Sequence, residues 1–198
     1  MPPPKKAAKS AAKKAPKKAA KHPDKEHKGH HKAKDLRRVY EHLGRVEILH
    51  AGLPTAAAGE VTTLVALAQQ QLRSSGESKD AADLLRAAEH LSFAALAGDR
   101  SRGVAVSAEL KTAIAEHFEE LSQRADEHWD NKEKRPETLS AIYLSCRKSA
   151  AKAFKLGAYH QALEYIRAAE ALAHGKDHGL PALPAGKQDR ILALTFAD

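Results

Sequence analysis

The sequence predicts an all-α protein, a helical bundle of about six helices built from two related helical hairpins and preceded by a disordered basic N-terminal tail. Apolar residues recur every three or four positions through most of residues 35–175, which is typical of amphipathic helices. Residues 76–91 (GESKDAADLLRAAEHL) and 157–172 (GAYHQALEYIRAAEAL) share a glycine, an alanine, the run Arg-Ala-Ala-Glu and a final leucine at identical positions. No segment shows a convincing strand pattern. The folded part, residues 35–198, is therefore expected to be helical.

Residues 1–34 form a low-complexity tail rich in lysine, alanine and proline. Twelve lysines stand against Asp24 and Glu26, so the tail carries +10 and the rest of the chain −2 of the total +8. With almost no large apolar side chain, such a segment cannot offset the entropy of ordering, and we expect it to be disordered when free. A cationic arm on a near-neutral body indicates a polyanionic partner.

The first predicted helix begins at Asp35, whose side chain suits an N-cap, and ends near His50, ahead of Gly52 and Pro54. Five residues form its apolar face: Leu36, Val39, Tyr40, Leu43 and Val46.

The first predicted hairpin covers about residues 57–98. One helix spans residues 57–74 and is closed by Gly76, and the next starts after Ser78 and continues to Gly98. Both carry apolar residues at helical spacing.

A long helix follows, with Ser107 as its N-cap and its end at about Asp130. The second predicted hairpin covers about residues 136–175. Pro136 suits the first position of its first helix, and Gly157 ends that helix. In the C-terminal segment, residues 180–198, the stretch 187–196 fits either a short helix or an extended docking segment.

The tail lysines are the predicted nucleic-acid-binding residues. Each phosphate that a lysine neutralises releases counterions, with a salt slope of about −0.9 per contact on duplex DNA. Without side chains that read base edges, the binding should be independent of sequence. The alternatives are a tail that only aids solubility and another acidic partner. The predicted residues are Lys5, Lys6, Lys9, Lys13, Lys14, Lys17, Lys18, Lys21, Lys25, Lys28, Lys32 and Lys34.

The composition of this tail resembles the tails of linker histones and of the lysine-, alanine- and proline-rich histone-like proteins of bacteria. The resemblance implies non-specific binding to DNA or RNA. We expect a cytoplasmic location, with the nucleoid in a bacterium or the nucleus in a eukaryote as the site of action. The pattern predicts neither a secretory signal nor a membrane-spanning helix, since no apolar run approaches about 18 residues.

The second hairpin resembles a tetratricopeptide unit, with small or apolar residues at matching positions: Ala150, Gly157, Tyr159, Ala162, Ile166 and Ala169. This resemblance implies a protein–protein interaction module whose groove binds a peptide. The hairpin is also similar to HEPN domains, whose nuclease members use an arginine and a histidine four to six residues apart. Arg37 and His42 have that spacing, so a HEPN-like ribonuclease is a further alternative.

The sequence contains no recognisable motif for catalysis, cofactor binding or metal binding. We therefore expect a protein that is not an enzyme and needs no cofactor. His22, His27, His30 and His31 form a histidine-rich patch, but no cysteine or carboxylate cluster has the spacing of a structural zinc site. Cys146, the single cysteine, lies on the apolar face of its helix and is expected to be a buried thiol. One cysteine also fits a reducing compartment.

Overall fold

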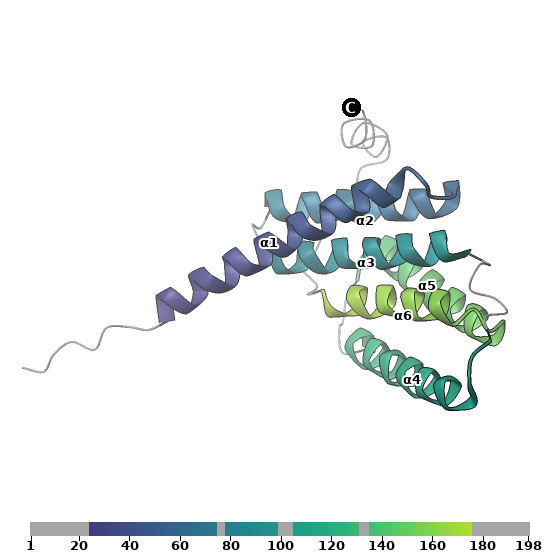
Figure 1. Ribbon diagram of the computed structural model, residues 1–198. Coiled ribbons are helices and arrows are strands. Elements are labelled where there is room, and N and C mark those ends of the chain that lie inside the picture. Colours follow the sequence, from purple (N-terminus) through teal and green to yellow (C-terminus); the bar gives the residue numbers. More distant parts are fainter. Residues whose placement is uncertain (1–23, 75–77, 99–104, 131–134, 176–198) are drawn as a thin grey trace, which may run out of the picture.

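The computed structural model of the chain describes residues 24–74, 78–98, 105–130 and 135–175. This part contains six α-helices and no strand, which confirms the all-α prediction (Figure 1). The helices are α1 (Asp24–His50), α2 (Thr55–Ser74), α3 (Ser78–Ala97), α4 (Ala108–Asp130), α5 (Glu137–Lys155) and α6 (Tyr159–His174).

The first helix starts earlier than the sequence pattern predicts. α1 begins at Asp24, directly after Pro23, rather than at Asp35. Lysine, the commonest residue of the stretch 24–34, is a good helix former. Large apolar residues begin only at Leu36, so the pattern does not indicate these turns. Residues 24–34 therefore belong to a helix, while residues 1–23 lie outside the described residues.

Three of the predicted cap and stop residues are confirmed: Ser107, Gly98 and Gly157. Pro136 is the N-cap of α5 rather than its first helical residue, and Gly76 lies outside the described residues. The Leu110 amide donates a hydrogen bond to Ser107 Oγ at 3.2 Å, which makes Ser107 the N-cap of α4. Gly98 and Gly157 have φ angles of +45° and +72°, in the left-handed region that favours glycine after a helix. The C-terminal segment, residues 180–198, lies outside the described residues.

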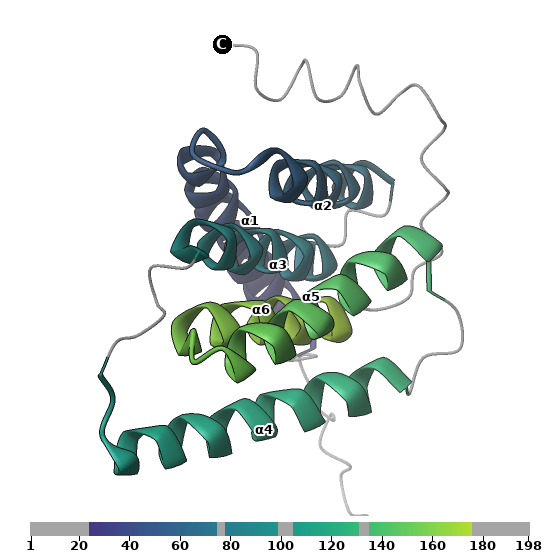
Figure 2. The same cartoon turned by 90° about the vertical axis from the view of Figure 1, so that its right-hand side faces the viewer.

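The six helices form two halves of three helices each. In one half α3 packs against α1 and α2, in the other α6 packs against α4 and α5, and α3 packs against α6 across the middle (Figures 1 and 2). The outer helices of a half make few contacts with each other. Hydrogen bonds from Gln161 to the Ala94 carbonyl (3.0 Å) and from His90 to Glu164 (2.7 Å) show that α3 and α6 run antiparallel.

Equivalent positions of the two halves make equivalent contacts. Arg45 of α1 pairs with Glu89 of α3 at 3.1 Å, and Arg124 of α4 pairs with Glu170 of α6 at 3.4 Å. The arginines stand 79 positions apart and the glutamates 81. The related units are therefore three-helix units, which extend the two predicted hairpins by one helix each.

The first and second helices of each half also contact each other at equivalent positions. His50 of α1 hydrogen-bonds to Thr62 of α2 at 3.1 Å. At the matching positions, the rings of Trp129 in α4 and Tyr143 in α5 stack with their centroids 3.8 Å apart. The second half thus joins its outer helices with a larger aromatic contact.

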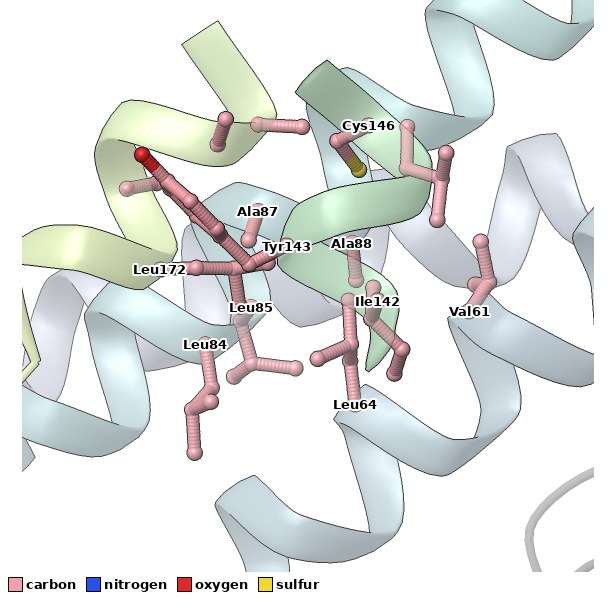
Figure 3. Packing of buried hydrophobic residues seen from close by; sticks show 14 of the residues in the cluster. Val61, Leu64, Leu84, Leu85, Ala87, Ala88, Ile142, Tyr143, Cys146 and Leu172 are labelled. Carbon is pink, nitrogen blue, oxygen red and sulfur yellow. The ribbon is translucent and has the colours of Figure 1, made fainter. Parts of the chain in front are cut away.

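The core lies where the two halves meet and consists of alanine and branched aliphatic residues. Figure 3 shows side chains of α2, α3, α5 and α6 that converge there, including Leu64, Leu85, Ile142 and Leu172. At the centre of α3 and α6, four alanines have no exposed surface: Ala87, Ala88, Ala168 and Ala169. Side chains this small let the two helices approach closely.

The buried stripe of α1 is narrower than predicted. Val39 and Val46 are buried, and Leu43 is partly buried against the core. Leu36 and Tyr40 are 43% and 67% exposed, which contradicts their predicted place on the buried face. The reason is that α1 packs mainly on a single neighbour, α3, and one contact covers only part of the apolar face.

Arg135 joins the C-terminal ends of α4 and α6. Its guanidinium donates to the carbonyls of His128 and Leu172 at 3.0 and 3.1 Å, and it lies 3.6 Å above the ring of Trp129. Tyr143 stacks at 3.8 Å from the same ring, so the arginine must occupy its other face. One side chain therefore satisfies the terminal carbonyls of two helices that are distant in sequence.

Replacing Arg135 with lysine is expected to lower the free energy of unfolding by about 2 kcal/mol, since an ammonium group cannot span both helix ends. Urea unfolding followed by circular dichroism measures this loss. Arg37→Lys is the matched control, because Arg37 is 81% exposed and should change stability by less than about 0.5 kcal/mol. Equal losses in the two variants would contradict the assigned role.

Candidate functional site

The predicted nucleic-acid-binding lysines are distributed between the N-terminal segment and α1. Lys34 is exposed, and Lys25, Lys28 and Lys32 belong to α1, at spacings of three and four residues. The remaining eight lie outside the described residues: Lys5, Lys6, Lys9, Lys13, Lys14, Lys17, Lys18 and Lys21.

The N-terminal part of α1 projects from the bundle. At about 1.5 Å per residue, the 27 residues of α1 extend for roughly 40 Å, whereas the 20 residues of α3 extend for roughly 30 Å. Figure 1 shows the purple N-terminal turns of α1 reaching beyond the other five helices. The lysines at positions 25, 28 and 32 are therefore carried on a helix that stands clear of the body.

Arg37 and His42, the pair that matches the HEPN nuclease spacing, do not form a common site. The Arg37 guanidinium donates to Glu41 at 2.6 Å on the exposed side of α1. His42 lies in the α1–α3 interface, 2.5 Å from Glu89. Five residues rotate a helix by about 140°, and the two side chains point in different directions accordingly.

A polar network joins α1, α3 and α6. Glu89 accepts hydrogen bonds from His42 and Arg45, and Glu164 pairs with His90 and Arg167, both at 2.7 Å. Burial opposes the ionisation of both glutamates, but the hydrogen bonds from their basic partners lower their pKa values. Every group in the network has a partner, so its role is to hold three helices together.

Cys146 is buried, as predicted. It is 1% exposed, and burial, assisted by the negative charge of Glu60, raises the pKa of its thiol. The thiol therefore remains protonated and is no nucleophile.

The structure offers no metal centre within its described residues, where no group of three or more histidine, cysteine or acidic side chains is placed to hold an ion. The histidine-rich patch falls on residues whose side chains are not described: His22, His27, His30 and His31. Among the described helices, none is long and apolar enough to cross a membrane.

A groove of about 470 Å³ opens between α4 and α5. Its α4 wall is acidic, with Glu119 and Asp126, and its α5 wall is basic, with Arg147 and Lys148. Phe118, Glu119, Ser122, Gln123, Asp126, Leu144, Arg147, Lys148 and Ala151 line it. These residues come from two helices that meet through side chains rather than through close backbone packing, which is why the sequence did not reveal the groove.

Two features of this groove are unusual for a protein surface that binds nothing. Leu144 is 63% exposed at its edge. Ser122 is only 6% exposed, yet its hydroxyl has no hydrogen-bond partner, whereas a buried hydroxyl is normally satisfied. Across the groove, Arg147 and Tyr143 both donate to Asp126, at 2.5 and 2.7 Å, and fix that carboxylate in place.

In the described residues of the first half, the positions equivalent to Phe118, Arg147 and Lys148 are buried. Phe118 corresponds to Val39, and Arg147 and Lys148 correspond to Ala66 and Leu67. Val39, Ala66 and Leu67 are all at most 7% exposed, so these positions are part of the apolar interior. The two halves share a scaffold, and only the second presents a polar, open surface at these positions.

The residues that carry the tetratricopeptide resemblance lie at the contact between α5 and α6. Ala150, Ala162, Ile166 and Ala169 are fully buried there, and Gly157 makes the turn between the helices. No family model, curated protein or solved structure matches this chain. Function is therefore inferred from the geometry and charge of the chain itself.

Proposed function

We propose that this protein is a non-enzymatic nucleic-acid-associated protein that binds DNA or RNA without sequence specificity through its lysine-rich N-terminus. The partition of charge supports this proposal. Residues 1–34 carry +10 and the remainder −2. The last lysines of this basic segment are held on the projecting turns of α1.

Lysine as the only cation of the tail favours backbone binding over base readout. An ammonium group is a flexible point charge that neutralises a phosphate, whereas bidentate recognition of a base usually needs arginine. Twelve lysines are enough for on the order of 6–10 phosphate contacts, which supply strong but salt-sensitive affinity. The projecting turns of α1 allow the segment to meet a polyanion without a clash between that polyanion and the near-neutral body.

Fluorescence anisotropy on random-sequence duplex DNA across a salt series tests the proposal. Neutralising Lys5, Lys9, Lys13 and Lys17 by substitution with glutamine should reduce the salt slope by about 3–4 and weaken binding by at least about tenfold at moderate salt. The same assay on single-stranded RNA shows which nucleic acid is preferred.

The matched control removes the same charge outside the tail. Glutamine at the four positions Lys79, Lys111, Lys176 and Lys187 should leave both slope and affinity nearly unchanged. Equal effects of the two variants, or no binding by the unmodified chain at moderate salt, would refute the proposal.

A protein–protein interaction scaffold is the second candidate function, and the α4/α5 groove favours it. An open surface with an exposed leucine and an unsatisfied buried hydroxyl is suited to another chain. In the scaffold case, the partner is retained when the tail lysines are neutralised.

A further inference from the structure

We propose that the α4/α5 groove is a self-association surface at which a second copy of the chain docks, with α5 of each copy against α4 of the other. The proposal concerns residues 108–155 and does not depend on the function of the tail. The charges of the two helices, the spacing of those charges and the unsatisfied Ser122 hydroxyl lead to it.

The two walls of the groove carry opposite charge. α4 has seven acidic residues against Lys111 and Arg124, a net charge of −5 with histidine neutral. α5 has four basic residues against Glu137, a net charge of +3. The two helices that form the groove therefore carry net charges of opposite sign.

Further charged residues of α4 and α5 follow the groove-lining Glu119 and Lys148 at helical spacing. On α4, Glu116 and Glu119 are exposed and lie one turn apart. On α5, Lys148, Lys152 and Lys155 are exposed and follow at spacings of four and three residues. Within the described part of the chain, none of these three lysines forms an ion pair. A row of unpaired ammonium groups is thus available to an acidic surface.

The centre of the groove can be desolvated. Leu144 is 63% exposed on α5, and the half-buried Phe118 faces the groove from α4. On the α4 wall, Ser122 has a buried hydroxyl without a partner, which costs free energy unless another group supplies a hydrogen bond. Apolar anchors inside a charged rim are the usual arrangement of a protein–protein interface.

A second copy fits both walls at once. In a two-fold arrangement the same surface patch of both subunits meets, so each pairing occurs twice. The basic wall of one copy then faces the acidic wall of the other, in both directions. The lysine-rich tail of the chain is a poorer occupant, because it would complement α4 but be repelled by α5.

Analytical ultracentrifugation of the full chain, without nucleic acid, tests this proposal. The unmodified chain should sediment as a dimer that dissociates on dilution or at high salt. Lys148→Glu alone and Glu119→Lys alone should each weaken dimerisation by at least about tenfold, because like charges then face each other twice. A 1:1 mixture of these two variants should dimerise again, since the new glutamate of one faces the new lysine of the other.

A second pair of variants tests the apolar centre of the groove, at Leu144. Leu144→Asp should abolish the dimer, whereas Ile48→Asp should not, because Ile48 is 80% exposed on α1 and lies outside the groove. A chain that remains monomeric up to its solubility limit would overturn the proposal. So would a dimer unaffected by the charge variants, or a mixture that fails to recover the dimer.

Discussion

Replacing Glu89 with alanine is expected to lower the free energy of unfolding by about 3 kcal/mol, because it leaves two basic groups without their carboxylate. The Glu89 side chain is 8% exposed and His42 is 18% exposed, so water cannot fully replace the lost interaction. Arg45 is 57% exposed and recovers its hydration, which limits the total. Equilibrium unfolding in urea with circular dichroism measures the loss.

Glu170→Ala is the control for this variant, because Glu170 occupies the equivalent position of the second half. Its partners Arg124 and His174 are more distant, at 3.4 and 3.7 Å, and the Glu170 side chain is 13% exposed against 8% for Glu89. The expected loss is about 1 kcal/mol, typical of a partly solvated ion pair. A loss at Glu170 equal to or larger than that at Glu89 would contradict the assigned role of the α1–α3 contact.

The carboxylates of Glu89 and Glu164 make the stability of the protein depend on pH. Basic partners lower the pKa values of Glu89 and Glu164 in the folded protein, so the unfolded chain takes up protons first as the pH falls. Their stabilising contribution is complete above the ordinary glutamate pKa of 4.5 and is lost as the pH falls through the folded values. Glu89→Gln should therefore flatten the decline of stability below about pH 5. An unchanged decline would contradict this.

Ala87→Leu is expected to cost about 3 kcal/mol, because three added carbons have no space at the centre of the bundle. Ala87 has no exposed surface, and neither does Ala168 at the equivalent position of α6. A larger side chain at either position must separate α3 from α6, on which both halves depend. Thermal and urea unfolding report the loss.

Ala33→Leu is the matched substitution at an exposed position of α1, where it should change stability by less than about 0.5 kcal/mol. Ala168→Leu should match Ala87→Leu within experimental error if the two halves are equivalent. A loss below about 1 kcal/mol at both buried positions would contradict the close approach of α3 and α6.

Features of the fold that depend on neighbouring residues could be predicted from the sequence. Ser107 caps its helix, and Gly98 and Gly157 end theirs, because capping depends on local backbone geometry. The exposure of Leu36 and Tyr40 could not be predicted, since periodicity identifies an apolar face but not how many helices cover it. The start of α1 was missed because its first turns lack apolar residues.

In the sequence, the internal repeat can be recognised mainly in α3 and α6, for a physical reason. α3 and α6 each contact three helices, and this crowding restricts their residues to the shared alanines and the Arg-Ala-Ala-Glu run. The outer helices have fewer neighbours, so α1 and α4 make equivalent contacts with different side chains. The groove could not be predicted at all, because Phe118 and Leu144 approach only after α4 and α5 have packed on α6.

The crossing of α3 and α6 also has a consequence for the order of folding. Contacts within a half join helices that follow each other along the chain, whereas His90 and Glu164 are 74 positions apart. Closing so long a loop costs entropy before any contact compensates for it, and distant contacts slow folding. We therefore expect the three-helix units to gain structure first as separate cooperative regions, and their docking through α3 and α6 to limit the rate at which the native protein forms.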